Sequence, residues 1–508
     1  MTDDVSFSKD FKNPVKLLQL FRIKKEEYFL KRGEKNALKL FGQMAQRVPG
    51  YRDFLKKNKI DYKKVKTIAD FKKIPTIDKD NYLRKYALRD LCWDGRLREK
   101  RWVFATTSGS TGEPFYFPRQ DNQDSQYAVL AELFLRSNFQ IEAKSTLFIV
   151  GFPMGAWIGG LFTYTALKIL AARGGYNLSI FTPGIVKAEI LKAVKKLGPN
   201  FDQVIIGSYG PFLKDIVDDA ESYGVNWKDY KLGFIFAAEG FSESFRDYIL
   251  KKTGTGDSLR STLNIYGTVD LGTMAHETPL SILVRRLALS QNKVYQNLFG
   301  DITKLPTLTQ YIPELFYFEA EGGNLVCSCY SGIPLARYDL KDHGDVLTFD
   351  EVRDRTRAGG VDLGREISKV GIGDSVWNLP FVHVYERSDF SVSFFAFQIY
   401  PETIRRALSK SELEGKITGK FTMMVKFDKN SNQYLEINVE LRPDIKGDEV
   451  LEDLVRESVT ERLLEENSEY CKTSEEFPDR TIPKIVFWPY EDPTCFKAGS
   501  KQKWVKKS

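Results

Sequence analysis

The chain has 508 residues, which is too long for a single hydrophobic core, so two or three domains are expected. Hydrophobic residues make up 42% of it, enough to build large cores, which excludes a disordered or fibrous protein. The 75 basic and 68 acidic residues leave a net charge of +7 spread along the chain, which argues against a nucleic-acid partner.

Five cysteines are few and odd in number, and they favour a reducing cytoplasm over a disulfide framework. The first residues contain no apolar run after a basic start, which argues against a signal peptide. Residues from about Asn13 to Asp94 are rich in lysine and carry apolar stripes at helical spacing. We therefore expect residues 1–95 to form a helical lead packed on a larger domain.

An uncharged run from Ser145 to Leu167 is long enough to suggest a transmembrane helix. Pro153 and four glycines interrupt it, however, which favours a buried strand, a turn and a helix instead. We therefore expect no transmembrane segment.

Beyond the run, short apolar segments alternate with helical ones, as at 185–197, 204–207, 212–223 and 232–238. This alternation predicts βαβ units and a mostly parallel sheet in a large domain over 96–386, whose ligands bind at the carboxyl ends of the strands.

The pattern changes after residue 386. Apolar residues alternate with mostly polar ones over 421–427 and 435–441, and the polar stretch 428–433 between them predicts an antiparallel hairpin. A helix with Leu451, Val455, Val459 and Leu463 on one face follows, and then a strand at 485–488. Residues 387–508 are therefore expected to form a small α+β domain.

A loop rich in hydroxyl residues and glycine follows the apolar run 102–105. Its central residues are Thr107, Ser108, Gly109, Ser110, Thr111 and Gly112. Such a loop offers many N–H and O–H donors to a phosphate, although it lacks the lysine of a Walker loop, and an ordinary solvated loop is the alternative. The order Thr-Ser-Gly-Ser-Thr-Gly-Glu-Pro resembles the phosphate-binding signature of the adenylate-forming (acyl-CoA synthetase-like) superfamily.

Segment 264–270, Asn-Ile-Tyr-Gly-Thr-Val-Asp, resembles that superfamily's aromatic-Gly-x-Thr-Glu motif. The resemblance implies that Tyr266 stacks on adenine, with Asn264 and Gly267 beside it, and that Asp270 binds magnesium. An aromatic face suits a purine, and a carboxylate suits a hard cation that bridges phosphates. This copy departs from the family in having a valine before the acid and in the shorter side chain of the acid itself.

Two further segments resemble nucleotide-binding motifs of the same superfamily. Ala238 and Glu239 follow the apolar run 234–237 and are similar to the Gly-Ala-Glu segment that lines the adenine. Asp342 closes a segment that begins at Arg337 and resembles the Arg-Tyr-x-x-x-Asp motif, which implies that Asp342 holds both ribose hydroxyls. A carboxylate can accept two O–H hydrogen bonds, whereas the alternative is an ordinary solvated acid.

The resemblance continues to the end of the chain. Arg387 and Asp389 lie in the segment 386–389, Glu-Arg-Ser-Asp, which resembles the Gly-Arg-x-Asp hinge and implies a cation near the nucleotide and a pivot for a mobile C-terminal domain. Lys501 is similar to the family's terminal catalytic lysine, with Lys497 and Lys503 as competitors. The family usually has glycine where Ala396 stands, in a loop beside the passage for the thiol.

Taken together, these motifs look most like the phenylacetate-CoA ligase branch. The resemblance implies an α/β fold with a small mobile C-terminal domain, and an acid-thiol ligase that uses ATP and Mg²⁺. A small carboxylic acid is adenylated and then transferred to a thiol, with coenzyme A as the expected acceptor. An acyl-carrier or other protein, or an amine, is the alternative acceptor, and a weakly catalytic nucleotide-binding protein is the alternative class. Residues 343–385 are longer than the branch needs and have no predicted role.

Overall fold

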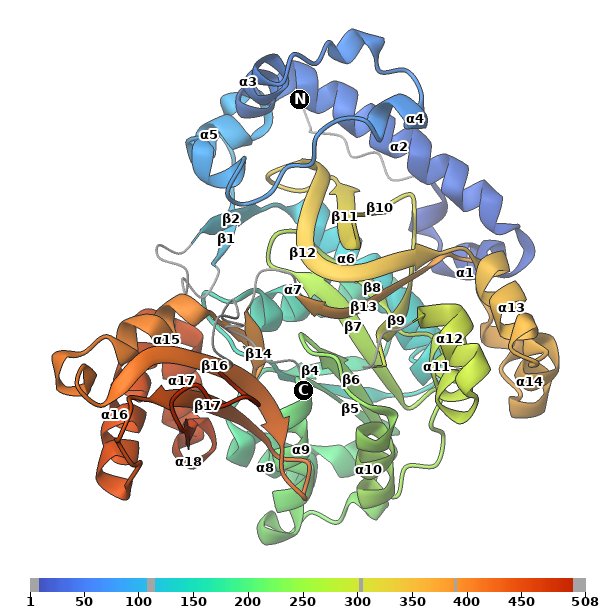
Figure 1. The fold of residues 1–508 in the computed structure, drawn as a ribbon. Helices are drawn as coiled ribbons and strands as arrows, with labels where there is room; N and C mark the ends of the chain where they lie inside the picture. The colour runs from blue at the N-terminus through green and yellow to red at the C-terminus, as the bar shows by residue number, and fades with distance from the viewer. Residues whose placement is uncertain (1–8, 107–114, 301–304, 388–390, 497–508) are drawn as a thin grey trace. The chain divides into compact units, whose positions relative to one another are not determined.

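The computed structural model describes residues 9–106, 115–300, 305–387 and 391–496 (Figure 1). Its internal contacts divide the chain into two compact units. The first takes in the described residues of Met1–Ala105, Phe117–Ser208 and Ile216–Glu386, and the second those of Thr106–Tyr116, Tyr209–Asp215 and Arg387–Ser508. The division into domains at 1–95, 96–386 and 387–508 stays a prediction.

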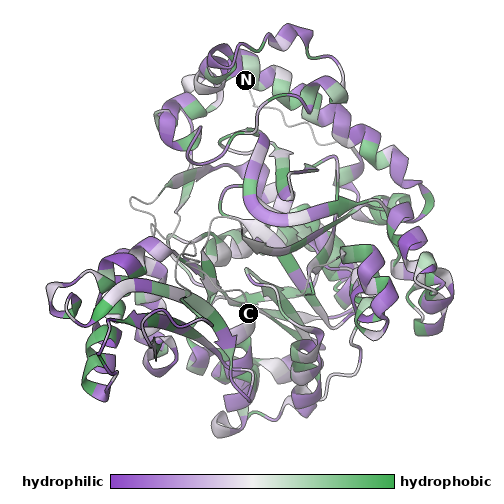
Figure 2. Ribbon diagram, in the orientation of Figure 1, coloured by the Kyte–Doolittle hydropathy of each residue, from purple (hydrophilic) through white to green (hydrophobic). Residues whose placement is uncertain are grey.

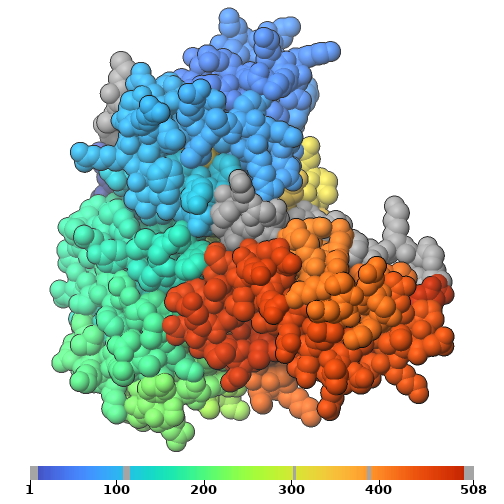
Figure 3. Space-filling view, turned by 90° about the vertical axis from the view of Figure 1, so that its left-hand side faces the viewer, coloured from blue at the N-terminus to red at the C-terminus, as the bar shows by residue number. Residues whose placement is uncertain are grey.

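Helices open the first unit, as the lysine-rich pattern predicted. They are α1 (Pro14–Ile23), α2 (Glu26–Arg47), α3 (Pro49–Lys57), α4 (Ile68–Phe71) and α5 (Leu88–Leu91). The side chain of Asn13 caps α1 by accepting a hydrogen bond from the Lys16 amide at 3.0 Å. α2 buries Phe29, Leu40 and Phe41 on one face and leaves its charged residues at the surface. In Figure 3 these blue helices form one continuous surface with the cyan segment that follows them.

An eleven-stranded sheet forms the centre of the first unit, in the order β10-β11-β12-β13-β9-β8-β7-β6-β5-β3-β4. In chain order its strands are β3 (Thr146–Gly151), β4 (Leu178–Phe181), β5 (Gln203–Ser208), β6 (Leu232–Ala237), β7 (Thr262–Thr268), β8 (Gly272–His276), β9 (Thr307–Tyr311), β10 (Phe316–Glu321), β11 (Asn324–Cys329), β12 (Leu335–Leu347) and β13 (Phe381–Arg387). β3 to β7 are parallel, which confirms the predicted βαβ units. At β8 the direction reverses, because a short hairpin rather than a helix joins it to β7.

Helices follow most of the parallel strands and cover the sheet. They are α6 (Asp121–Phe139), α7 (Ile158–Gly174), α8 (Lys187–Leu197), α9 (Gly210–Asp219), α10 (Glu243–Thr253), α11 (Pro279–Ser290) and α12 (Asn292–Phe299). The uncharged run at 145–167 is the buried strand β3, a turn and α7, as predicted. Among the described residues, no helix has both the length and the apolar character that crossing a membrane requires. Hydrophobic residues concentrate on the central strands in Figure 2.

The segment 343–385, for which the sequence predicted no role, adds cover to the sheet. It contains the end of β12, the helices α13 (Phe349–Ala358) and α14 (Leu363–Val370), and the start of β13. Val352, Val361, Leu363 and Ile372 are buried in one cluster with apolar residues of α11 and α12. The segment therefore packs with α11 and α12 in one hydrophobic core that also includes Leu308 of β9 and Phe381 of β13.

The described residues after 390 form a smaller α+β part, which confirms the predicted fold class. Its elements are β14 (Val392–Phe394), β15 (Phe397–Ile399), α15 (Pro401–Leu408), β16 (Ile417–Phe427), β17 (Gln433–Leu441), α16 (Glu449–Glu466), α17 (Ser468–Glu476), α18 (Pro478–Thr481) and β18 (Lys484–Trp488). β16 and β17 form the predicted hairpin. Its turn is held by Asp428, whose Oδ1 accepts hydrogen bonds from the amides of Asn430 and Asn432 at 2.8 and 2.7 Å. A separate two-stranded sheet, β1 (Val103–Thr106) and β2 (Tyr116–Arg119), flanks residues 107–114 in the sequence.

Candidate functional site

The ends of β6 and β7 bring the first predicted site residues together. The two strands are parallel neighbours, and β6 leads directly into Ala238, which turns the chain with a φ of 71°. The Nδ2 of buried Asn264 on β7 donates to the Glu239 carbonyl at 2.9 Å. Its Oδ1 has no hydrogen-bond partner within the described chain. Because a buried acceptor without a donor is costly, this edge of the sheet is suited to a ligand with an N–H group.

Tyr266 and Asp342 belong to motifs far apart in the sequence, yet they meet. The Tyr266 hydroxyl donates to Oδ2 of Asp342 at 2.6 Å. Both residues are buried, and the Tyr266 ring stacks against Phe318 at a centroid distance of 6.3 Å. An aromatic surface and a carboxylate are thus placed side by side, near the end of β7 that carries Asn264.

Gly267 lies where β7 turns into β8. A Cβ at this position would lie 2.6 Å from the Gly272 carbonyl oxygen, and that oxygen belongs to the backbone. Glycine is therefore required for the close approach of the two strands, independently of any ligand.

We expect Gly267→Ala to lower the free energy of unfolding by about 1–3 kcal/mol, because the hairpin must open to admit the methyl group. The shift of the urea unfolding midpoint measures this loss. Gly256→Ala is the matched control, since a Cβ there meets open space. Equal midpoints for the two variants would contradict the steric account of Gly267.

Asp270, the predicted metal ligand, lies buried in the turn after β7. The Tyr338 hydroxyl donates to its Oδ2, and the Lys79 ammonium lies 3.4 Å from its Oδ1. Both carboxylate oxygens therefore face groups of this chain. Within the described residues, no group of three or more His, Cys, Asp or Glu side chains is placed to hold a metal ion.

Lys79 reaches Asp270 because its segment is bound to β12. The Ile77 amide donates to the Arg337 carbonyl at 3.0 Å, and the Asp339 amide donates to the Ile77 carbonyl at 2.8 Å. The next residue, Asp78, shapes a tight turn by accepting from the amides of Asp80 and Asn81 at 2.9 and 2.7 Å. This turn presents the side chain of residue 79 toward the sheet.

Lys341 pairs with the acids on either side of this junction, at 2.7 Å from Asp78 and 2.9 Å from Asp339. Burial alone would raise the pKa of Asp78, but hydrogen bonds from the Asn81 amide and from Lys341 hold it below its ordinary value. Arg337, at the start of the predicted ribose motif, is itself buried against Glu319 and donates to the Ile74 carbonyl. Arg337 therefore anchors the helical lead to the sheet.

A buried cluster of charged side chains contacts the backbone of β7 at Asn264. Arg246 and Arg285 bind Glu277 at 2.8 and 2.9 Å, and Glu243 binds both arginines. Burial would raise the pKa of Glu243, but the arginines around it lower it. Glu277 also accepts from the Asn264 amide at 2.8 Å. We refer to these four side chains as the buried ion cluster, and through Glu277 it fixes the backbone of β7 at the site.

The Arg285 guanidinium also binds the loop after β6. Its Nη2 donates to the Phe241 carbonyl at 2.8 Å, and its Nε donates to the Pro306 carbonyl at 2.9 Å. The loop that contains Ala238 and Glu239 is therefore tied to the same cluster as Asn264.

His276 does not face this site. Its Nδ1 lies 2.8 Å from the Glu277 carbonyl, and its ring packs edge-on against Phe134 and Trp377. Burial lowers the pKa of His276 to about 4, so the imidazole is neutral near pH 7. These contacts favour a structural role over a place in a substrate pocket.

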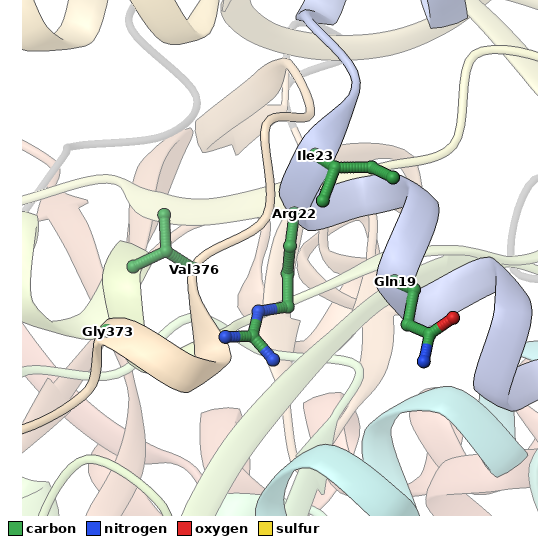
Figure 4. A pocket seen from close by; sticks show the side chains of 5 residues that line it. All are labelled: Gln19, Arg22, Ile23, Gly373 and Val376. Atoms are coloured by element: carbon green, nitrogen blue, oxygen red, sulfur yellow. The ribbon is translucent and has the colours of Figure 1, made fainter.

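A pocket of about 340 Å³ lies elsewhere in the first unit, between α1 and the turn before β13 (Figure 4). It is lined by Gln19, Arg22, Ile23, Gly373 and Val376. The Arg22 guanidinium points into the space between α1 and this turn. None of the predicted site residues lines the pocket.

Several predicted residues lie outside the described part of the chain: Thr107, Ser108, Gly109, Ser110, Thr111, Gly112, Asp389 and Lys501. Arg387 is the last residue of β13, and the structure describes its backbone only. Sequence reasoning missed Lys79, Tyr338 and Lys341. The Asp78-x-x-Asn81 turn was a visible signal for the local bend, but nothing in the sequence connected it with Asp270.

Comparison with solved structures identifies the fold. A structure of 2-hydroxyisobutyryl-CoA ligase in complex with 2-HIB-AMP and CoA, in the thioesterification state, matches with a TM-score of 0.64 and 14% identity. A second structure of that enzyme, in the postadenylation state with R3-HIB-AMP, matches with a TM-score of 0.52 and 13% identity. Each match covers 96% of this chain and 92% of the other. No family model matches the chain, and a search of curated proteins gives no match. The chain therefore shares the fold of these ligase structures.

Proposed function

We propose that this protein is an adenylate-forming enzyme that activates a small carboxylic acid with ATP and then transfers the acyl group to an acceptor. The observation that carries the proposal is the contact between Tyr266 and Asp342, which belong to two distant motifs that the resemblance assigns to one nucleotide, with Asn264 on the same strand as Tyr266. The shared fold supports it, since the 2-hydroxyisobutyryl-CoA ligase structures hold an adenylate and, in one case, CoA. We further propose that the protein belongs to the phenylacetate-CoA ligase branch and works in the cytoplasm.

In this proposal the adenosine lies at the end of β7. The unpartnered Oδ1 of Asn264 accepts from the exocyclic amino group of adenine, and the Glu239 segment lines the base. The Tyr266 ring provides an aromatic surface for the purine. Asp342, held in place by the Tyr266 hydroxyl, accepts hydrogen bonds from both ribose hydroxyls.

The phosphates then extend toward Asp270. Its carboxylate is a suitable ligand for Mg²⁺, which takes one or two protein carboxylates and completes its shell with phosphates and water. When bound, the ion supplies charge neutralisation at the phosphates. Residues 107–112, Arg387 and Lys501 are the proposed phosphate and transition-state contacts, by resemblance, with Asp389 as the hinge.

The chemistry needs no nucleophilic side chain. A carboxylate oxygen of the acid attacks the α-phosphorus of ATP, the bond to the β-phosphate oxygen breaks, and pyrophosphate leaves with the electron pair. A thiol or another acceptor then attacks the acyl carbonyl carbon, and AMP leaves. The enzyme contributes by positioning the groups and stabilising the charge that develops at phosphorus.

Exchange of labelled pyrophosphate into ATP, screened over a library of carboxylic acids, tests the first step. We expect exchange with one class of acid and none without acid. If no acid supports exchange while ATP still binds, the protein belongs instead to the alternative class of weakly catalytic nucleotide-binding proteins.

Ala396 bears on the identity of the acyl acceptor. β14 and β15 are joined by Phe395 and Ala396 alone, with φ of 45° and 74°. Positive φ favours glycine, so both residues hold a strained backbone in the loop that the resemblance places beside the thiol passage. We propose coenzyme A as a slow acceptor, with a carrier protein or an amine as the alternative.

Ala396→Gly is expected to stabilise the hairpin by about 1 kcal/mol and to raise the yield of acyl-CoA per adenylate formed. Removing the Cβ relaxes the turn and widens the approach for the thiol. The measurements are the urea midpoint and the ratio of acyl-CoA to AMP with the activating acid. A wild-type protein that already converts its adenylate completely to acyl-CoA would contradict the role given to Ala396.

A further inference from the structure

We infer that Lys79 and a divalent metal ion are mutually exclusive partners of Asp270, so that the helical lead controls metal binding at the nucleotide site. The inference rests on the proposed function, because it concerns the metal that accompanies ATP. It adds a residue outside every motif that the sequence pointed to.

Both carboxylate oxygens of Asp270 already have partners in this chain. The Lys79 ammonium lies 3.4 Å from Oδ1 of Asp270, and Oδ2 is occupied by the Tyr338 hydroxyl. A magnesium ion binds a carboxylate oxygen at about 2 Å. Placed on Oδ1, the ion would lie close to the ammonium in a partly buried setting, where repulsion between like charges is strong. One of the two cations must leave.

Backbone hydrogen bonds of the Lys79 segment hold Lys79 near Asp270. Ile77, two residues before Lys79, is completely buried and pairs with β12 through two backbone hydrogen bonds. Both acids adjacent to Lys79 along the chain already have partners: Asp78 is bound to Lys341 and to two amides of its own turn, and Asp80 is bound to Arg84 at 2.8 Å. Neither acid is therefore available to draw Lys79 away, and Asp270 is the carboxylate that Lys79 faces.

The side chain of Lys79 can still move. It is about one-third exposed, at 34% of its full accessible surface, whereas that of Asp270 is 6% exposed. Its ammonium can therefore swing into solvent when a metal ion takes Oδ1, while the carboxylate stays fixed by Tyr338. In the absence of metal, Lys79 neutralises an otherwise costly buried charge.

The test is the linkage between metal and nucleotide. The dissociation constant of α,β-methylene-ATP is measured by calorimetry with EDTA and with Mn²⁺. The constant with EDTA divided by the constant with Mn²⁺ gives the coupling between metal and nucleotide. We expect Lys79→Met to raise this ratio about 10-fold over wild type, because the competing cation is gone. Any direct contact between Lys79 and phosphate affects both constants and largely cancels in the ratio.

Three further variants test whether the effect depends on the charge of residue 79 and on the Asp270 carboxylate. Lys79→Arg keeps the positive charge and should keep the wild-type ratio. Lys85→Met removes an exposed lysine from the same segment and should also leave the ratio unchanged. Asp270→Asn should lower the ratio, since the shared carboxylate is lost.

The outcomes separate the inference from the function on which it rests. If the nucleotide binds and Lys79→Met leaves the ratio at its wild-type value or lowers it, the inference is overturned and the proposed function stands. If wild-type protein binds no nucleotide with either EDTA or Mn²⁺, both are overturned.

Discussion

Replacing Arg246 with methionine is expected to lower the free energy of unfolding by about 3–5 kcal/mol, because it leaves buried carboxylates without their partner. Arg246 is completely buried, and its guanidinium bonds to both oxygens of Glu277 at 2.8 Å. It also donates to Glu243 at 2.9 Å and to the Thr262 hydroxyl at 2.7 Å. Methionine fills a similar volume but satisfies none of these acceptors.

Arg286→Met is the matched control for this prediction. Arg286 follows Arg285 on α11 and also contacts Glu243, at 3.0 Å, but its side chain is 28% exposed. Its loss should cost about 1 kcal/mol or less, as for ion pairs near the surface. Urea midpoints measure both variants. If Arg246→Met shifts the midpoint no more than Arg286→Met, the buried ion cluster does not stabilise the fold as described.

Asp342→Asn is expected to weaken ATP binding by at least about 100-fold, since two hydrogen bonds from ribose hydroxyls to a charged acceptor contribute about 1.5–3 kcal/mol each. Asparagine keeps an oxygen that can accept from the Tyr266 hydroxyl, so the local packing should survive. Calorimetric titration of the nucleotide measures the effect. Asp345→Asn, which changes an exposed acid on the same strand, should leave the affinity within about twofold, because it removes no buried hydrogen bond.

The deoxynucleotides make this prediction specific to the ribose. Wild-type protein should discriminate against 2′-deoxy-ATP and 3′-deoxy-ATP, and Asp342→Asn should lose most of that discrimination, because each analogue lacks one of the two donors. A wild-type protein that binds ATP and both analogues equally would show that Asp342 does not hold the ribose.

Local patterns predicted the parts of this fold that local interactions decide. The strict alternation over 421–441 became the hairpin β16–β17, and Leu451, Val455, Val459 and Leu463 became the buried face of α16. The uncharged run at 145–167 was correctly divided, because Pro153 and its neighbouring glycines interrupt any continuous helix. In each case residues close in sequence settle the structure.

Contacts between residues far apart in the sequence were not predicted, because local patterns do not show which distant residues meet. Arg246 and Arg285 lie on helices whose charges look like solvated surface, and their burial depends on Glu277, which follows β8, and on Glu243. In the sequence, Lys79 resembles the other lysines of a basic segment. In the structure, pairing of its segment with β12 brings it to 3.4 Å from Asp270. Charge patterns along one element do not specify the opposite charge that meets them in the fold.

If this protein forms an acyl-adenylate, one carboxylate oxygen of the acid must end in the AMP that is released. The activating acid, labelled with ¹⁸O in its carboxylate, is incubated with the protein, ATP and an acceptor, and the products are analysed by mass spectrometry. Attack of the carboxylate on the α-phosphorus predicts one ¹⁸O atom in the AMP released and none in pyrophosphate. Label in inorganic phosphate, or AMP without label, would contradict adenylate chemistry.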